Sequence, residues 1–182
     1  MKNKKQTPFS KLSKPEQRVK VAKDVLLQLK KKTYIASVGK YVVTNDLLEI
    51  GLKKEDDIRK NFKKIQQCRC CALGSCLLSI TKFKNTLTVG DLGGGINSYK
   101  EKEAKKLFTM FSPQQLLLIE NSFEGSPSDS MTMRIGANVF GKNTTNEQDE
   151  KCTSFYNRYD NVNDRLVAIM KNIVANKGTF KP

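Results

Sequence analysis

Helix-capping residues followed by apolar side chains at helical spacing recur along this 182-residue chain. Ser13 stands ahead of Pro15 and Glu16, which is the pattern of a capping box with a proline in the first turn. Three further residues are placed to cap helices: Asn45, Ser98 and Ser112. These patterns predict a mainly α fold, a compact multi-helix domain with at most one small β-hairpin.

Helices are predicted at about 15–31, 46–50, 53–67, 71–83, 98–110, 113–124 and 147–159, with a last one from about 164 that Gly178 ends. The first helix is expected to pack one apolar stripe inward, formed by Val19, Ala22, Leu26 and Leu29. The helix at 71–83 is expected to be the most buried, because apolar side chains cover much of its circumference.

Three stretches lack helical spacing. Residues 33–43 are rich in β-prone side chains around Gly39 and predict a short hairpin or an extended connector. Residues 86–97 include Gly93, Gly94 and Gly95 and are predicted to form a loop, and 131–140 could form a strand.

Charge is the strongest indication of a partner. The chain has 33 Lys and Arg against 18 Asp and Glu, a net charge of +15. Residues 1–32 alone hold eleven basic and two acidic side chains, a net charge of +9. We expect residues 1–12 to be a flexible basic arm ahead of a single mainly helical domain at 13–182. Such a charge predicts a polyanionic partner, although a lysine-rich, merely solubilising tail would give the same composition.

The candidate contacts to nucleic acid or to a protein partner are basic side chains of the arm, the first helix and the 53–67 helix. They are Lys2, Lys4, Lys5, Lys11, Lys20, Lys23, Lys31, Arg59, Lys60, Lys63 and Lys64. Aromatic residues are not interleaved with them, and no helix-turn-helix is evident, so contact with phosphates is expected rather than reading of bases.

The chain contains no histidine. Triads with a histidine base and the usual catalytic zinc sites are therefore excluded, while carboxylate, lysine or tyrosine chemistry stays open. No complete catalytic constellation is present, so we predict a protein that is not an enzyme and that needs no cofactor.

Cysteine is the remaining candidate for metal or redox chemistry. Cys68, Cys70 and Cys71 are crowded together, with Cys76 and Cys152 further along, and Cys68 and Cys71 form a CxxC pair. A zinc site would need four ligands, and a second CxxC is missing. Zinc binding and CxxC redox chemistry remain alternatives, but reduced, metal-free cysteines packed in the core are the favoured interpretation.

A phosphate-loop spacing also occurs at Gly136, Gly141 and Lys142. Asn143 follows where Ser or Thr should hold magnesium, so a nucleotide site is not predicted. Neither a secretory signal nor a membrane-spanning segment is found in the sequence, and we expect a protein of the bacterial cytoplasm without membrane contact.

Four stretches carry a resemblance: RVKVAKDVLLQL (18–29), CRCCALGSCLLS (68–79), FSPQQLLLIENSFEG (111–125) and RLVAIMKNIVANKGTF (165–180). They resemble small proteins of phages, plasmids and other mobile elements of gut bacteria. Within that group, the length and basic character are similar to type II-A anti-CRISPR inhibitors, which block the RNA-guided effector nuclease and associate with double-stranded DNA. The motifs are helix caps and core positions, so no functional residue is carried over.

Three hypotheses follow. The resemblance implies a stoichiometric inhibitor that binds a type II CRISPR effector nuclease with its guide RNA and interferes with target recognition or cleavage. The basic surface alone predicts a general nucleic-acid-binding accessory or regulatory protein of a phage. An enzyme using cysteine or zinc is the third. A basic chain cannot imitate DNA, so an inhibitor of this kind would contact acidic nuclease surface, guide RNA or target DNA.

Overall fold

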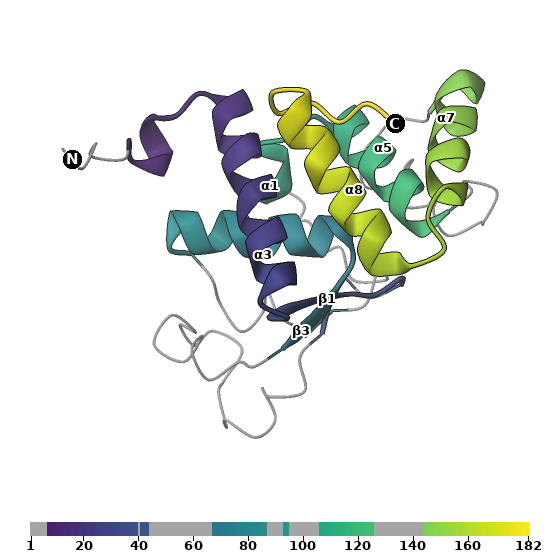
Figure 1. Cartoon of the computed structure of the whole chain (residues 1–182). Coiled ribbons are helices and arrows are strands. Elements are labelled where there is room, and N and C mark those ends of the chain that lie inside the picture. The colour runs from purple at the N-terminus through teal and green to yellow at the C-terminus, as the bar shows by residue number, and fades with distance from the viewer. Residues whose placement is uncertain (1–6, 40, 44–66, 87–92, 95–105, 126–143) are drawn as a thin grey trace, which may run out of the picture.

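The computed structural model describes residues 7–39, 41–43, 67–86, 93–94, 106–125 and 144–182 (Figure 1). These residues form a mainly helical domain with one small sheet, as the sequence predicted. Several predicted elements lie outside the described residues: the helices at 46–50 and 53–67, most of the one at 98–110, the strand at 131–140 and the spacing at 136–142. Residues 106–108 are helical.

Helix α1 (Lys14–Lys30) begins at the predicted capping box. The Ser13 backbone N–H donates to Glu16 Oε2 over 2.8 Å, and the Ser13 hydroxyl donates to the same oxygen over 2.6 Å. The expected inward stripe is only partly correct. Val21, Ala22 and Val25 are fully buried, whereas Val19, Leu26 and Leu29 are half-buried. The buried face differs from the expected stripe because α1 packs against α3, α8 and β1 rather than against a single element.

Helix α3 (Ala72–Lys84) is the most buried helix, as predicted, and every residue from Ala72 to Thr81 is inside. Cys71 is its N-cap, and its sulfur accepts from the Gly74 N–H at 3.5 Å. Gly74 lets the sheet approach, since a Cβ there would lie 1.6 Å from the Tyr41 carbonyl oxygen. Glycine is the residue that permits such close backbone contact.

The sheet has the strand order β1-β3-β2-β4. Its strands are β1 (Tyr34–Ala36), β2 (Val42–Val43), β3 (Cys68–Cys70) and β4 (Gly93–Gly94). β3 pairs parallel to β1 and antiparallel to β2, while β4 pairs antiparallel to β2. Residues 33–43, predicted as a short hairpin or an extended connector, do contain strands, but β1 and β2 do not pair with each other. β1 and β2 are separated by β3, which alternates buried cysteines with the exposed Arg69 and completes the core between them. Gly93 and Gly94, predicted to be in a loop, are a strand instead.

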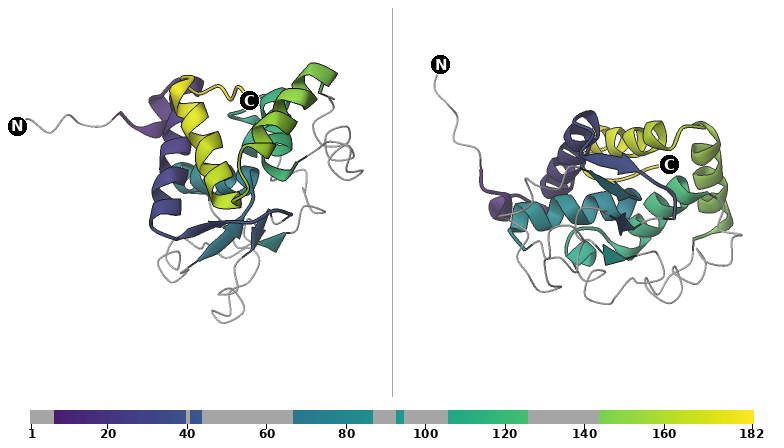
Figure 2. Two further views of the ribbon diagram at one scale, coloured as in Figure 1. Left: turned by 45° about the vertical axis from the view of Figure 1, so that its right-hand side comes forward. Right: turned by 90° about the horizontal axis from the view of Figure 1, so that it is seen from below.

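Three helices complete the core: α5 (Pro113–Glu124), α7 (Asn146–Asn157) and α8 (Val162–Ala175). Ser112 caps α5 and Gly125 follows its end, both as predicted. Figure 2 shows α1 and α8 in one layer and α3 and α5 in a second, with α7 at one end and the sheet along one edge.

Part of the expected arm is packed. Residues Phe9–Lys11 form a 3-10 turn, η1, whose Phe9 is buried and stacks on Phe83 with ring centres 4.7 Å apart. Gln17 Nε2 donates to the carbonyl oxygens of Phe9 and Leu12, both at 3.0 Å. Residues 9–11 of the expected arm therefore contact the helical domain, and the apolar Phe9 is the residue that attaches them. Residues 1–6 lie outside the described part of the chain.

Candidate polyanion-binding site

The two helices of the front layer, α1 and α8, lie side by side and run in opposite directions (Figure 1). Arg18 ties them together at one end, because its Nε donates to the Gly178 carbonyl over 2.5 Å and Nη1 donates to the Met110 carbonyl over 2.8 Å. Gly178 touches α1 directly, since a Cβ there would lie 2.4 Å from the Pro15 carbonyl oxygen. Arg18 and Gly178 therefore set the spacing of the two helices, and the surface hollows over them follow from it.

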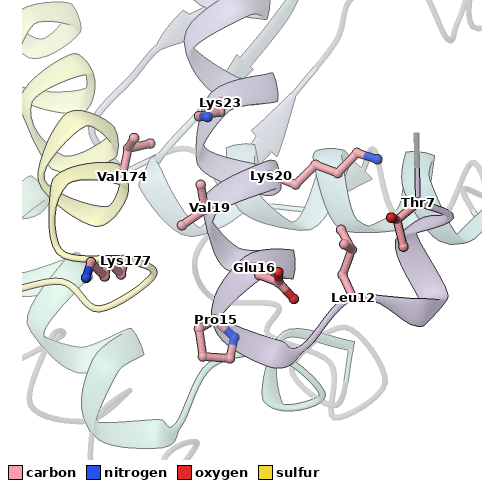
Figure 3. Close-up of a pocket in the computed structure, with 9 residues that line it drawn as sticks. All are labelled: Thr7, Leu12, Pro15, Glu16, Val19, Lys20, Lys23, Val174 and Lys177. Atoms are coloured by element: carbon pink, nitrogen blue, oxygen red, sulfur yellow. The ribbon is translucent and has the colours of Figure 1, made fainter. Parts of the chain in front are cut away.

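The upper hollow, of about 680 Å³, lies over the first half of α1 and the end of α8. It is lined by Thr7, Leu12, Pro15, Glu16, Val19, Lys20, Lys23, Val174 and Lys177. Figure 3 shows Val19 on the side of α1 that faces Val174, while Lys20 extends on the other side toward Thr7. Three ammonium groups thus surround a partly apolar floor.

The lower hollow, of about 570 Å³, lies over the other end of α1 and the start of α8. It is lined by Leu26, Leu29, Lys30, Lys32, Tyr34, Ile35, Gln67, Asn163, Val167 and Lys171. Among the described residues, the lining contains three lysines and no acidic residue. Together the two hollows place six lysines along one face, which we call the lysine face: Lys20, Lys23, Lys30, Lys32, Lys171 and Lys177.

The two acidic side chains of α1 lie differently relative to this face. The Glu16 carboxylate lines the upper hollow and is held in the capping box by Ser13, whose hydrogen bonds lower the pKa of Glu16 and favour its charged form. Asp24 points inward, where it accepts from Lys82 Nζ at 2.7 Å and from the Ser79 hydroxyl at 2.9 Å. Six ammonium groups against the one Glu16 carboxylate leave the lysine face positive, and its potential reaches about 8–10 Å into solvent at physiological ionic strength.

Two of the lysines have an unusual backbone conformation. Lys32 (φ +58°) and Lys177 (φ +52°) are left-handed, a region that favours glycine. Each directly follows the cap of a helix and closes a Schellman motif, with the Thr33 N–H bonded to the Gln28 carbonyl and the Gly178 N–H bonded to the Ile173 carbonyl. A lysine at each of these positions makes the fold less stable than a glycine would, because its Cβ is unfavourable in the left-handed conformation. It also places an ammonium group at the rim of a hollow.

The structure brings together only some of the predicted contact residues. Lys20 and Lys23 line the upper hollow, and Lys11 and Lys31 are exposed but line neither hollow. The Lys20 ammonium also lies 5.4 Å from the centre of the Phe83 ring, a cation–π contact. The others lie outside the described residues: Lys2, Lys4, Lys5, Arg59, Lys60, Lys63 and Lys64.

Sequence reasoning missed the lysines of the C-terminal segment. Lys171 and Lys177 are about 140 residues or more from Lys30 and Lys32, so only the pairing of α8 with α1 brings the two groups onto one face. A partial signal was present, because Lys171 lies on the polar side of a helix with the buried positions Leu166, Ile169 and Ile173.

The cysteines lie in the core. All five are free and buried. Burial raises the pKa of Cys70 and Cys71 well above the ordinary value for a thiol and raises that of Cys76 to about 12. A thiolate is the reactive form, so these environments oppose nucleophilic chemistry. Within the described part of the chain, His, Cys, Asp and Glu side chains form no group of three that could hold a metal ion.

A second polar cluster lies at the far end of α5. Glu124 Oε2 accepts from the Gly39 N–H at 2.9 Å, and burial raises the pKa of Glu124 to about 7 against the opposing effects of this bond and Arg165. Arg165 is 4% exposed and donates to the carbonyl oxygens of Phe123 and Tyr159. These bonds join α5, α8 and the chain after β1, which is a structural role.

Among the described helices, none is both long enough and apolar enough to cross a membrane. Comparison with protein-family profiles, with curated proteins and with solved structures found no match.

Proposed function

We propose that this chain is a non-enzymatic binding protein that holds nucleic acid through the lysine face of α1 and α8. The observation that carries the proposal is the gathering of six lysines from both ends of the chain onto one face, where Glu16 is the one acidic residue among the described residues that line the two hollows. A polyanion is the ligand that such a face attracts, and duplex DNA or RNA is the commonest polyanion in a cell.

The size of the face fits a duplex backbone. Helix α1 has 17 residues and is about 25 Å long at 1.5 Å per residue. One strand of B-DNA presents a phosphate about every 3.4 Å along the axis, so the face can meet several phosphates at once. Lysines act as mobile point charges here and reach phosphates without reading bases, so binding with little sequence preference is expected.

The salt dependence of binding tests this proposal. Each phosphate that the protein no longer neutralises lowers the slope of log K against log salt by about 0.9 on duplex DNA. Anisotropy of a fluorescent 20-base-pair duplex, measured between 50 and 200 mM salt, should show a slope lower by up to about 1.8 for Lys23→Ala combined with Lys177→Ala.

Lys151→Ala is the matched control. Lys151 is exposed on α7, away from the lysine face, and its Nζ lies 2.6 Å from Glu147. Its removal should leave the slope unchanged. Equal slopes for the double variant and the wild type would contradict phosphate binding by the upper hollow.

The resemblance in the sequence supports a more specific proposal: stoichiometric inhibition of a type II CRISPR effector nuclease with its guide RNA. The four stretches that carry it lie largely in α1, in β3 and α3, in α5 and in α8, which are the packed elements of the domain. A lysine face could act on such a nuclease by occupying guide-RNA or target-DNA backbone, which the effector itself holds in a positively charged channel.

Titration against a fixed amount of guide-loaded effector tests inhibition. A binder removes cleavage in proportion to the inhibitor-to-nuclease ratio and leaves guide and nuclease intact. Reversing the charge of Lys20, Lys23 and Lys31 should weaken inhibition while the helical circular dichroism is retained. Inhibition at strongly substoichiometric amounts would indicate turnover, and no inhibition at large excess would leave the general nucleic-acid-binding function.

A further inference from the structure

The lower hollow differs from an ordinary charged surface in its floor. Four aliphatic side chains there are only half-buried: Leu26, Leu29, Ile35 and Val167. They come from α1, from the edge of the sheet and from α8, and they gather in one depression. Covering this apolar surface removes it from water and is favourable, so the hollow is suited to an apolar side chain.

The rim of the lower hollow selects the charge of its occupant. Lys30, Lys32 and Lys171 stand around the floor and are exposed, and no acidic residue is among the lining side chains that the structure describes. Lys32 is held there in the left-handed conformation described above. An occupant must therefore combine an apolar group with negative charge.

The sheet edge beside the hollow adds a third requirement. Among the described strands, β1 is the outermost of the sheet, with β3 on its inner side. The Ala36 N–H is bonded to Asn163 Oδ1 at 3.1 Å, so a single side chain from α8 stands where a further strand would lie. Tyr34, Ile35 and Asn163 all line the hollow. An edge strand is a pairing partner for an extended peptide.

We propose that the lower hollow docks an extended acidic segment of a partner protein. An apolar side chain of the segment fills the floor, its carboxylates pair with the three rim lysines, and its backbone runs along β1 and displaces the Asn163 side chain from the Ala36 N–H. Nucleic acid fits less well, because a sugar–phosphate backbone has no aliphatic side chain for the floor. Among the described lining residues the one aromatic ring is that of Tyr34, which is 1% exposed and offers no face for a base to stack on.

This inference does not depend on nucleic-acid binding at the upper hollow. A fluorescein-labelled peptide of alternating leucine and glutamate provides the probe, and a peptide with lysine in place of glutamate is its control. Anisotropy with the full chain should show binding of the acidic peptide only. Lys171→Glu and Val167→Asp should each weaken it by about tenfold or more, which corresponds to about 1.4 kcal/mol.

Lys181→Glu makes the same change of net charge as Lys171→Glu at an exposed position outside the lower hollow, and it should change the affinity by less than about twofold. Val167 is half-buried, so the folding of Val167→Asp is checked by thermal unfolding. If Val167→Asp is unfolded, Lys171→Glu still tests the proposal independently.

Equal peptide affinity in the wild type, Lys171→Glu and Lys181→Glu would overturn the proposal, and so would absence of binding to the wild type. The rim lysines would then serve only to protect the strand edge from aggregation. A loss of duplex affinity in Lys171→Glu without any loss of peptide affinity would assign the hollow to nucleic acid and also overturn it. Peptide binding without any duplex binding would contradict the proposed function and leave this inference standing.

Discussion

Lys177 offers a test in which stability and binding respond in different ways. Both Lys177→Ala and Lys177→Gly remove the ammonium group from the rim of the upper hollow. The two variants differ in the backbone, because residue 177 has φ +52° and alanine keeps the Cβ that makes this conformation unfavourable. Binding should therefore fall equally in both variants, whereas stability should separate them.

The magnitude follows from two opposing contributions. A left-handed non-glycine residue costs about 1–2 kcal/mol, which glycine avoids. Glycine also loses more conformational entropy on folding than alanine does, which lowers the stability of the glycine variant by about 0.5–1 kcal/mol. The glycine variant should thus be more stable than the alanine variant by up to about 1.5 kcal/mol, with about 0.75 kcal/mol at the middle of the two ranges. For a chain of this size, the middle value raises the melting temperature by about 2–3 °C.

The assay combines urea unfolding followed by circular dichroism with duplex anisotropy at several salt concentrations. The salt slope should be smaller by up to about 0.9 in both variants. An alanine variant at least as stable as the glycine variant would refute the strained conformation at 177. A full salt slope in both variants would show that Lys177 does not contact phosphate.

Other predictions concern the core and the N-terminal segment. The folded pKa of Glu124, about 7, lies above its ordinary value of 4.5, so the contribution of Glu124 to stability is greatest at low pH and is lost as pH rises from about 4.5 to 7. Glu124→Gln should remove up to about 3 kcal/mol of this dependence, measured by urea unfolding at several pH values between about 4.5 and 8. Gly74→Ala should destabilise the fold by about 3 kcal/mol or more, because its Cβ would overlap the Tyr41 carbonyl, and a melting temperature like that of the wild type would contradict this packing. The four lysines near the N-terminus to be replaced with alanine are Lys2, Lys4, Lys5 and Lys11. Their replacement should lower the salt slope by up to about one unit for each phosphate that they neutralise. An unchanged slope would show that this segment is only a solubilising tail. The buried cysteines should react with iodoacetamide only after unfolding and copurify without zinc, and one equivalent of zinc with unfolding on chelation would contradict that.

The helices could be predicted because their signals are local. The capping box at Ser13 and the Ser112–Pro113 start involve residues no more than three positions apart, and both occur where predicted. The burial of α3 followed from apolar side chains around its whole circumference, which leaves no face suited to water. The buried positions of α8 followed from their spacing in the same way.

The strand pairing could not be predicted from the same kind of signal. β1 and β2 are close in sequence and looked like a hairpin, yet β3 pairs with both of them. β3 is three residues long, and its cysteines resembled a metal or redox motif more than a strand. The position of β3 depends on backbone pairing with strands that are distant in the sequence and on packing against α3. A short stretch of sequence carries no information on either.

Caps, periodicity and charge are properties of neighbouring residues, so the helical class, several helix ends and the excess of positive charge are already contained in the order of the amino acids. Where that charge acts depends on the packing of the whole domain. Packing turns Asp24 inward to Lys82 and Ser79, stacks Phe9 on Phe83, and sets α8 beside α1, so that Lys171 and Lys177 join the lysines of the first helix. A functional face of this kind is built from contacts between distant segments, and those contacts exist only once the core has formed.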